Sequence, residues 1–242
     1  MIVKKGECDM VLKNNDTITL SIPELAPAVK ESFMALRTNL LFMKDTKMIA
    51  ITSSLANEGK SVTSFHLALS FANAGKKTLL IDGDLRRSRL CKYLGIGKEY
   101  PGLSEFLSQQ HEEKVFSTSI ENLSLMLSGK CPPNPSELLI QDNFPAMMEK
   151  LREQYDYVFI DTPPVCSATD ATIIARAVDG VLLVVRSDYV KRKVIEKSKR
   201  IITRNEGRVI GVALNRLDQH HAGYYGYYGY YGYGYEHGSE KK

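Results

Sequence analysis

The chain has 242 residues, which is enough for one sizeable domain with its own hydrophobic core. Its hydrophobic fraction of 43% is that of a soluble globular protein, and a formal net charge of +4 is too small to indicate a nucleic-acid partner. The four cysteines show no CxxC pair, so neither a disulfide framework nor a zinc site is expected. No run approaches the roughly 18 apolar residues of a membrane span, and no signal peptide is evident. These features predict a cytoplasmic protein.

Two kinds of apolar spacing alternate along the chain after an extended, irregular lead-in over residues 1–22. Residues 26–43 carry apolar side chains at intervals of three and four, which predicts an amphipathic helix. Further on, continuous apolar runs alternate with helical patterns, and residues 86–122 predict short helices and loops. The predicted strands cover residues 48–54, 77–84, 123–129, 155–164, 180–187 and 209–215, and the further helices cover residues 61–75, 135–140, 143–154, 170–178 and 190–206.

This order of elements predicts an α/β fold with a mostly parallel sheet and helices on both faces. Continuous apolar strands are typical of sheets that are buried on both sides, and alternation of strand and helix gives parallel pairing. In such sheets, ligands bind beyond the carboxyl ends of the strands. We therefore expect a core domain over residues 23–218, with its functional site at that edge, followed by a separate segment over residues 219–242.

The segment "SLANEGKS", residues 54–61, follows the first core strand and precedes a helix, as a phosphate-binding P-loop does. The pattern GxxxxGK[ST] needs backbone N–H groups around phosphates, a lysine that reaches the β- and γ-phosphates, and a hydroxyl for Mg²⁺. Serine replaces the first glycine, and an asparagine inside the loop tolerates a left-handed conformation. A purely structural turn is the alternative. The predicted nucleotide-binding residues are Ser54, Asn57, Glu58, Gly59, Lys60, Ser61 and Val62.

Acidic side chains end two further predicted strands at the same edge. Asp82 and Asp84 follow the strand "LLID", and Asp161 ends the strand "YVFID". Any one of them could be an ordinary turn residue, but three beside a Lys-Ser loop predict a Mg²⁺-nucleotide site. Ser61 would bind the metal directly, Asp161 would hold its water shell, and Asp82 is a further candidate ligand.

A tract of tyrosine and glycine lies near the C-terminus, and it sustains neither a helical nor a strand period. Glycine at every second or third position raises the entropic cost of folding, so we expect a disordered tail with accessible hydroxyls. A sticky low-complexity segment is the bland alternative. The tyrosines are Tyr224, Tyr225, Tyr227, Tyr228, Tyr230, Tyr231, Tyr233 and Tyr235.

Together these motifs resemble the bacterial tyrosine kinases (BY-kinases) of capsule and exopolysaccharide systems, in their stand-alone cytoplasmic form. The likeness rests on "TSSLANEGKS" as Walker A, "LLIDGDLRRSRL" as Walker A′, "VFIDTPP" as Walker B, "PPNPSELL", and the tyrosine tract. It implies ATP and Mg²⁺ as cofactors and autophosphorylation of the eight tail tyrosines between neighbouring subunits. It also implies a membrane-spanning activator of the chain-length-regulator type, which would recruit the protein to the inner face of the membrane, and a cognate tyrosine phosphatase.

The resemblance also implies roles for individual residues. Lys60 would contact phosphates, Asp82 and Asp84 would be the catalytic carboxylates, and Asp161 would be the Walker B acid. A tyrosine hydroxyl needs a proton acceptor, and the sequence leaves Asp82 and Asp84 open, with a preference for Asp82. By analogy of fold, Asn215 is a candidate adenine contact, although a strand-terminating turn is nearly as plausible.

Two positions depart from the family pattern. In the family, a helical motif Glu-x-x-Arg-x-x-Arg serves ring assembly. Here Glu31 and Arg37 keep two of its positions, but Met34 replaces the first arginine, so we expect the subunit contacts of a ring oligomer to be weaker. Asn57 stands where the family usually has glycine.

Other interpretations remain. Partitioning ATPases of the MinD/ParA type share the Walker boxes, but they carry an early signature lysine where this chain has Leu55. A non-catalytic scaffold, whose tail would bind a partner, is a third interpretation. Such a scaffold would not need Lys60, Asp82 and Asp161 together. The basic run over residues 191–200 is typical of a solvated helix face, with a lipid or nucleic-acid patch as the alternative.

Overall fold

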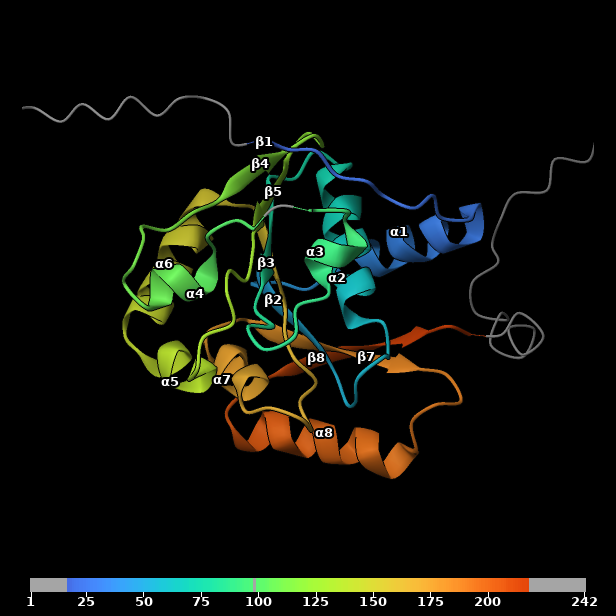
Figure 1. Cartoon of the computed structure of the whole chain (residues 1–242). Coiled ribbons are helices and arrows are strands. Elements are labelled where there is room, and N and C mark those ends of the chain that lie inside the picture. Colours follow the sequence, from blue (N-terminus) through green and yellow to red (C-terminus); the bar gives the residue numbers. More distant parts are fainter. Residues whose placement is uncertain (1–16, 98, 218–242) are drawn as a thin grey trace, which may run out of the picture.

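A single sheet with helices on both faces forms the body of the protein, as a computed structural model of residues 17–97 and 99–217 shows (Figure 1). In this part of the chain, eight strands occur in the order β1-β4-β5-β3-β6-β2-β7-β8. All neighbouring strands are parallel except β4 and β5. The strands are β1 (Thr17–Ile18), β2 (Met48–Ser53), β3 (Thr78–Asp82), β4 (Phe116–Thr118), β5 (Leu123–Met126), β6 (Tyr157–Asp161), β7 (Gly180–Arg186) and β8 (Val209–Asn215).

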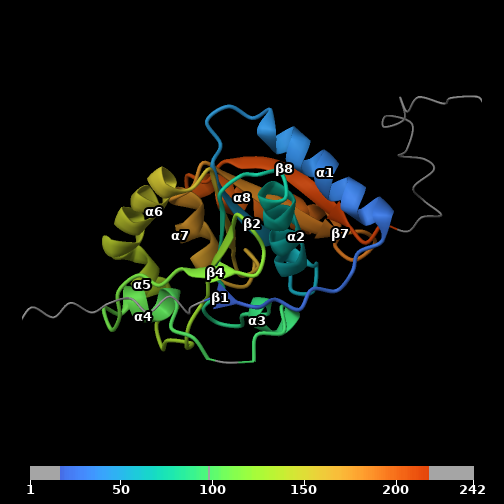
Figure 2. The same cartoon turned by 90° about the horizontal axis from the view of Figure 1, so that it is seen from above.

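The helices form two layers, one on each face of the sheet (Figure 2). One layer contains α1, α2 and α3, and the other contains α4 to α8. Along β2, Ile49 and Ile51 face the first layer while Met48 and Ala50 face the second, so every side chain is buried. The helices are α1 (Pro27–Leu41), α2 (Lys60–Ala72), α3 (Leu90–Tyr93), α4 (Leu103–Leu107), α5 (Pro135–Ile140), α6 (Asn143–Gln154), α7 (Asp170–Arg176) and α8 (Arg192–Arg204).

The predicted fold class is confirmed, and the central strands lie where the continuous apolar runs placed them. Two expectations were wrong in detail. Residues 86–122 contain β4 as well as helices and loops, and the end of the lead-in, Thr17–Ile18, forms β1. Both strands are too short to show a periodicity, and they form because partner strands complete their hydrogen bonds. The boundary at residue 22 stays a prediction, and residues 219–242 lie outside the described residues.

Strand order brings the acidic strand ends together. β6 lies between β3 and β2, and Asp82 pairs directly with Asp161 across the β3–β6 ladder. The loops that follow β2, β3 and β6 therefore leave the sheet side by side at its carboxyl edge. In the described part of the chain, no helix is both long and apolar enough to cross a membrane.

Candidate active site

The loop between β2 and α2 has the backbone conformation of a phosphate cradle. Asn57 and Gly59 have φ values of 65° and 93°, in the left-handed region that the sequence led us to expect for Asn57. A Cβ atom at position 59 would overlap the side-chain amide of Asn215, so only glycine fits there. α2 begins at the next residue, Lys60, and its first N–H groups point out of the helix without partners in it.

Hydrogen bonds of Glu58 and Asn215 attach this loop to the neighbouring strands. The Glu58 carboxylate is fully buried, and it accepts hydrogen bonds from the backbone N–H of Leu55 at 2.6 Å and of Arg186 at 3.1 Å. Asn215 donates from Nδ2 to the Glu58 carbonyl oxygen at 2.9 Å. The loop is therefore fastened to the carboxyl ends of β7 and β8, and the Asn215 amide is engaged by protein rather than directed outward.

Ser54, at the first position of the loop, faces α8. Its Oγ lies 2.8 Å from Oγ of Ser198, which is also fully buried, and Cys166 Sγ lies 3.3 Å from the same Ser198 oxygen. The side chain predicted to bind nucleotide thus points away from the cradle, and it instead connects the loop to the helix behind it.

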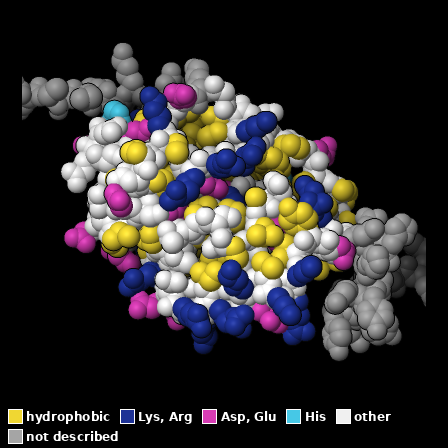
Figure 3. All heavy atoms as spheres, turned by 60° about the horizontal axis from the view of Figure 1, so that its bottom comes forward, with side chains coloured by type: hydrophobic (Ala, Val, Ile, Leu, Met, Phe, Trp, Pro, Cys, Tyr) yellow, Lys and Arg dark blue, Asp and Glu magenta, His cyan; other side chains and the backbone are white. Residues whose placement is uncertain are grey.

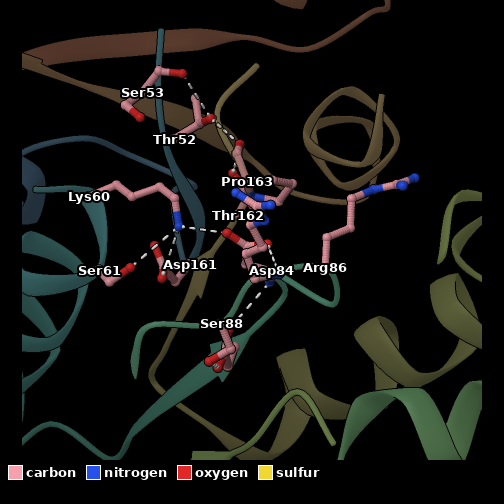
Figure 4. Close-up of polar contacts among 12 residues, drawn as sticks. Thr52, Ser53, Lys60, Ser61, Asp84, Arg86, Ser88, Asp161, Thr162 and Pro163 are labelled. Carbon is pink, nitrogen blue, oxygen red and sulfur yellow. Dashed lines mark hydrogen bonds and ion pairs between the residues drawn. The ribbon is translucent and has the colours of Figure 1, made fainter. Parts of the chain in front are cut away.

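One lysine meets the carboxylates of two strand ends (Figure 4). Lys60 Nζ lies 3.0 Å from Asp84 Oδ2, 3.4 Å from Asp161 Oδ2 and 3.3 Å from Ser61 Oγ. Asp161 also accepts a hydrogen bond from Ser64 at 3.1 Å. Asp82 lies deeper, where it accepts hydrogen bonds from the Ser88 hydroxyl and, at 3.3 Å, from the Asp84 N–H.

Burial and mutual repulsion shift the titration of these groups. Burial, together with the nearby Asp161 carboxylate, raises the pKa of Asp82 to about 7, while the Ser88 hydrogen bond opposes the rise. Burial also raises the pKa of Asp161, against the attraction of Lys60. For Lys60, burial lowers the pKa, but the attraction of Asp161 and Asp84 outweighs it and the pKa is raised overall. The lysine is therefore a fixed positive charge.

A cavity of about 870 Å³ opens beside this cluster. Asn57, Gly59, Lys60, Ser61, Val62 and Asp84 line it, whereas Ser54, Glu58, Asp82, Asp161 and Asn215 lie behind its wall. Five arginines at the rim of the cavity were not predicted from the sequence, although the segment "DLRRSR" directly after the acidic strand end could have indicated three of them. They are Arg86, Arg87, Arg89, Arg186 and Arg216.

Arg86 is the rim residue that is tied most firmly to the protein. It donates from Nε to the buried carboxylate of Asp170 at 2.7 Å and from Nη2 to the Ser136 hydroxyl at 2.9 Å. Ser136 lies in the "PPNPSELL" segment, so this contact joins that segment to the loop that follows β3 and carries Asp84. A second cavity, of about 440 Å³, lies between α1 and α2 and contains none of the predicted site residues.

Among the described residues, no group of three His, Cys, Asp or Glu side chains is arranged to ligate a metal by itself. The donor set nevertheless suits Mg²⁺, because the hydroxyl of Ser61 and the carboxylates of Asp84 and Asp161 already surround a cation, the Lys60 ammonium. The roles predicted for Lys60, Ser61, Asp82, Asp84 and Asp161 stay predictions.

The parallel sheet, the glycine-lysine-serine loop at a helix N-terminus and the acidic strand ends define a P-loop nucleotide-binding protein. The family described as "AAA domain" matches residues 46–205. The tyrosine-protein kinase CpsD of Streptococcus agalactiae serotype III is 41% identical over 202 residues, which are 82% of this chain and 87% of that protein. The chain belongs to the bacterial tyrosine kinases (BY-kinases), the family that its motifs resemble.

Solved structures agree with this assignment. The crystal structure of the chimerical protein CapA2B2 superimposes with a TM-score of 0.76 at 33% identity, covering 84% of this chain and 95% of that one. The septum site-determining protein MinD of Pyrococcus horikoshii, complexed with Mg-ADP, reaches a TM-score of 0.61 at 21% identity, covering 72% of each chain. At that identity, MinD shows a shared fold alone.

Replacing Glu58 tests how the loop is held. Glu58→Ala leaves the N–H groups of Leu55 and Arg186 without their acceptor, and we expect the free energy of unfolding to fall by about 2 kcal/mol. Glu58→Gln keeps one acceptor oxygen and should lose roughly half as much. Urea unfolding followed by circular dichroism measures both.

Glu112→Ala is the matched control, since Glu112 is exposed, and it should change stability by less than about 0.5 kcal/mol. A Glu58→Ala protein as stable as this control would show that Glu58 does not hold the loop.

Proposed function

We propose that this protein is an ATP-dependent tyrosine autokinase, which phosphorylates its own C-terminal tyrosine cluster and thereby regulates the synthesis and export of capsular or extracellular polysaccharide. The observation that carries the proposal is the ammonium of Lys60 at 3.0 Å and 3.4 Å from two strand-end carboxylates, on the wall of a cavity large enough for a nucleotide. The kinase family of the chain supports the reaction, and the tyrosine tract supplies its substrate.

The charges of the cavity suit a magnesium nucleotide. Lys60 is the cation that lies among the buried carboxylates of Asp82, Asp84 and Asp161, so negative charge remains beside the cavity. The rim is positive, and the N-terminus of α2 favours anions. Bound there, ATP would supply the phosphoryl group and Mg²⁺ would neutralise the charge of its phosphates.

Each residue of the cradle would have one task. The backbone N–H groups from Gly59 to Val62 would hold phosphate oxygens, and Lys60 would leave Asp84 to meet the β- and γ-phosphates. Ser61 and Asp161 would hold the metal, with Asp161 acting through water. Glu58, Asn215 and Ser54 would act on the shape of the loop through their contacts with β7, β8 and α8.

We assign proton acceptance to Asp82. A pKa of about 7 suits a general base near neutral pH. The Asp84 side chain is already engaged by Lys60 at 3.0 Å and by the N–H of Arg87 at 3.0 Å. Asp84 lines the cavity and Asp82 does not, so the Ser88 hydroxyl must release Asp82 before the substrate hydroxyl can reach it.

The last described strand ends close to the cradle, because Asn215 ends β8 and contacts the loop. Tyr224 follows nine residues later, which allows at most about 30 Å of reach. This distance serves the protein's own site or that of a close neighbour. The family supports delivery to a neighbouring subunit.

Replacing Lys60 tests the site. Lys60→Met should abolish autophosphorylation, since no other cation among the described residues lies between Asp84 and Asp161. Intact-mass spectrometry after incubation with MgATP counts the phosphates, and circular dichroism checks the fold. Normal phosphate incorporation by the folded variant would remove Lys60 from the mechanism.

The same assay separates the two carboxylates. Asp82→Asn should lower kcat by roughly 100-fold and remove the ionisation near pH 7 from the kcat–pH profile. Asp84→Asn should leave that ionisation in place. The reverse result would assign proton acceptance to Asp84.

Replacing the tail tyrosines tests the substrate. A protein with all eight changed to Phe should bind ATP normally and incorporate no phosphate, because the changes leave the loop residues 54–62 intact and remove the accepting hydroxyls. Phosphopeptide mapping locates any residual label. Undiminished labelling at Tyr93, Tyr100, Tyr155, Tyr157 or Tyr189 would show that the tail is not the substrate.

We further propose a membrane-spanning activator of the chain-length-regulator type, a cognate tyrosine phosphatase, and weak self-association through α1. Met34 is 52% exposed in place of the arginine of the assembly motif. Arg37 donates to the carbonyl oxygen of Ser70 at 2.7 Å and to its hydroxyl at 3.2 Å, so it already serves the packing of α1 on α2. Subunit contacts through this helix should therefore be weaker than the family pattern gives.

The activator prediction follows. The purified protein should be weakly active, and the cytoplasmic segment of an adjacent chain-length regulator should raise both its activity and its association. Phosphate counting measures the activity. Light scattering measures association by comparing the unphosphorylated Lys60→Met protein with fully phosphorylated wild type. Full activity of the purified protein without the segment, or identical masses of the two forms with the segment present, would contradict this proposal.

A further inference from the structure

The outer face of α8 carries a row of cations without counter-ions. Only Ser198 and Ile202 of the helix are buried. Its neighbouring acids are already engaged, because Glu196 pairs with Arg192 at 2.9 Å and Glu206 pairs with Arg176 at 3.0 Å. Among the described residues, no ion pair holds the other cations of this face, which are Lys191, Lys193, Lys197, Lys199, Arg200 and Arg204.

Their spacing concentrates the charge on one stripe. Lys193, Lys197, Arg200 and Arg204 follow one another at intervals of four, three and four residues, so each lies beside the next on the helix surface. Like charges at these intervals destabilise a helix by a few tenths of a kcal/mol per pair. An anion bound along the stripe would remove this repulsion.

Exposed apolar side chains lie on β8, the strand that contacts α8. Val212 and Leu214 of β8 are 56% and 51% exposed. They pair with Leu183 and Val185 of β7, and therefore point to the face of the sheet that α8 covers. Figure 3 shows Lys and Arg side chains gathered on this side of the molecule beside hydrophobic ones. The surface thus offers apolar contact and positive charge together.

The described part of the chain ends near this surface. β8 ends on the side of the molecule where α8 begins (Figure 1). Tyr224 follows Leu217 by seven positions, which allows at most about 25 Å, while the 13 residues of α8 span about 20 Å. The tyrosine tract can therefore lie along the helix.

We propose that the phosphorylated segment Tyr224–Tyr235 docks on this α8 surface, with phosphates on the cations and rings against Val212 and Leu214. The phosphates rest on the proposed autokinase function, and each adds about −1.5 to −2 charges. Between Tyr224 and Tyr235 the unmodified tract holds only tyrosine and glycine, so the surface selects the product over the substrate. Docking removes the product tail from the cavity and keeps it out.

A binding assay tests this without kinase activity. The protein is the full chain with all eight tail tyrosines changed to Phe, and the probe is a fluorescent synthetic peptide of residues 221–237 with chemically installed phosphotyrosine at four of its tyrosines. Fluorescence anisotropy at about 0.15 M salt measures its dissociation constant. The α8 variant is Lys193→Glu, Lys197→Glu and Arg200→Glu together, and the matched control is Lys44→Glu, Lys76→Glu and Lys92→Glu on the other face.

We expect the α8 variant to bind the phosphopeptide at least about tenfold more weakly and the control to change by less than about twofold. The unphosphorylated peptide should bind at least about tenfold more weakly to every protein. Urea unfolding confirms that both variants are folded.

Equal losses in the two variants, or equal binding of the two peptides, would overturn the proposal. So would vesicles rich in phosphatidylserine that bind through α8 while the phosphopeptide neither binds nor competes, since the surface would then serve a membrane. A protein that never phosphorylates its own tail would refute the proposed function and leave the peptide result unchanged.

Discussion

Repulsion among three buried carboxylates is the constraint around which the site is built. Asp82 and Asp161 end neighbouring strands in direct register, so the sheet forces them together as soon as β3 and β6 pair. With Asp84 beside them, they hold more negative charge than Lys60 neutralises, and burial followed by the repulsion of Asp161 raises the pKa of Asp82. The strand order of this parallel sheet therefore places excess negative charge at its carboxyl edge, and this charge favours the binding of a further cation.

Distant elements shape the phosphate loop. Its backbone conformation depends on Glu58, which two N–H groups hold, and on Asn215, which lies at the far end of the sequence. The serine in place of the first motif glycine is explained by the same logic, because Ser54 directs its hydroxyl to Ser198 on α8 and leaves the cradle open. The serine at this position therefore adds no side chain to the interior of the loop.

The sequence predicted those features that local chemistry determines. Continuous apolar runs gave the central strands, and carboxylates at strand ends gave Asp82, Asp84 and Asp161, because both signals are contiguous in the chain. It could not give the task of Glu58, whose partner on β7 lies 128 residues away. The arginine rim was missed for the same reason, since Arg186 and Arg216 reach the cavity only after β7 and β8 have joined the sheet. β4 carried too few residues for any period to appear.

The net charge of +4 does not show how the charges are distributed, and this distribution determines where an anion can bind. Negative charge is buried at the ends of β3 and β6, while arginines line the cavity rim and cations line α8. In the proposed reaction, a tyrosine would enter such a field neutral and leave it as a dianion. The buried carboxylates would then repel the new phosphate and the cationic surfaces would attract it, so the proposed reaction would itself reverse the preferred position of the substrate. The amino-acid composition gives only the sum of these charges, whereas the fold places the carboxylates and the cations in separate regions.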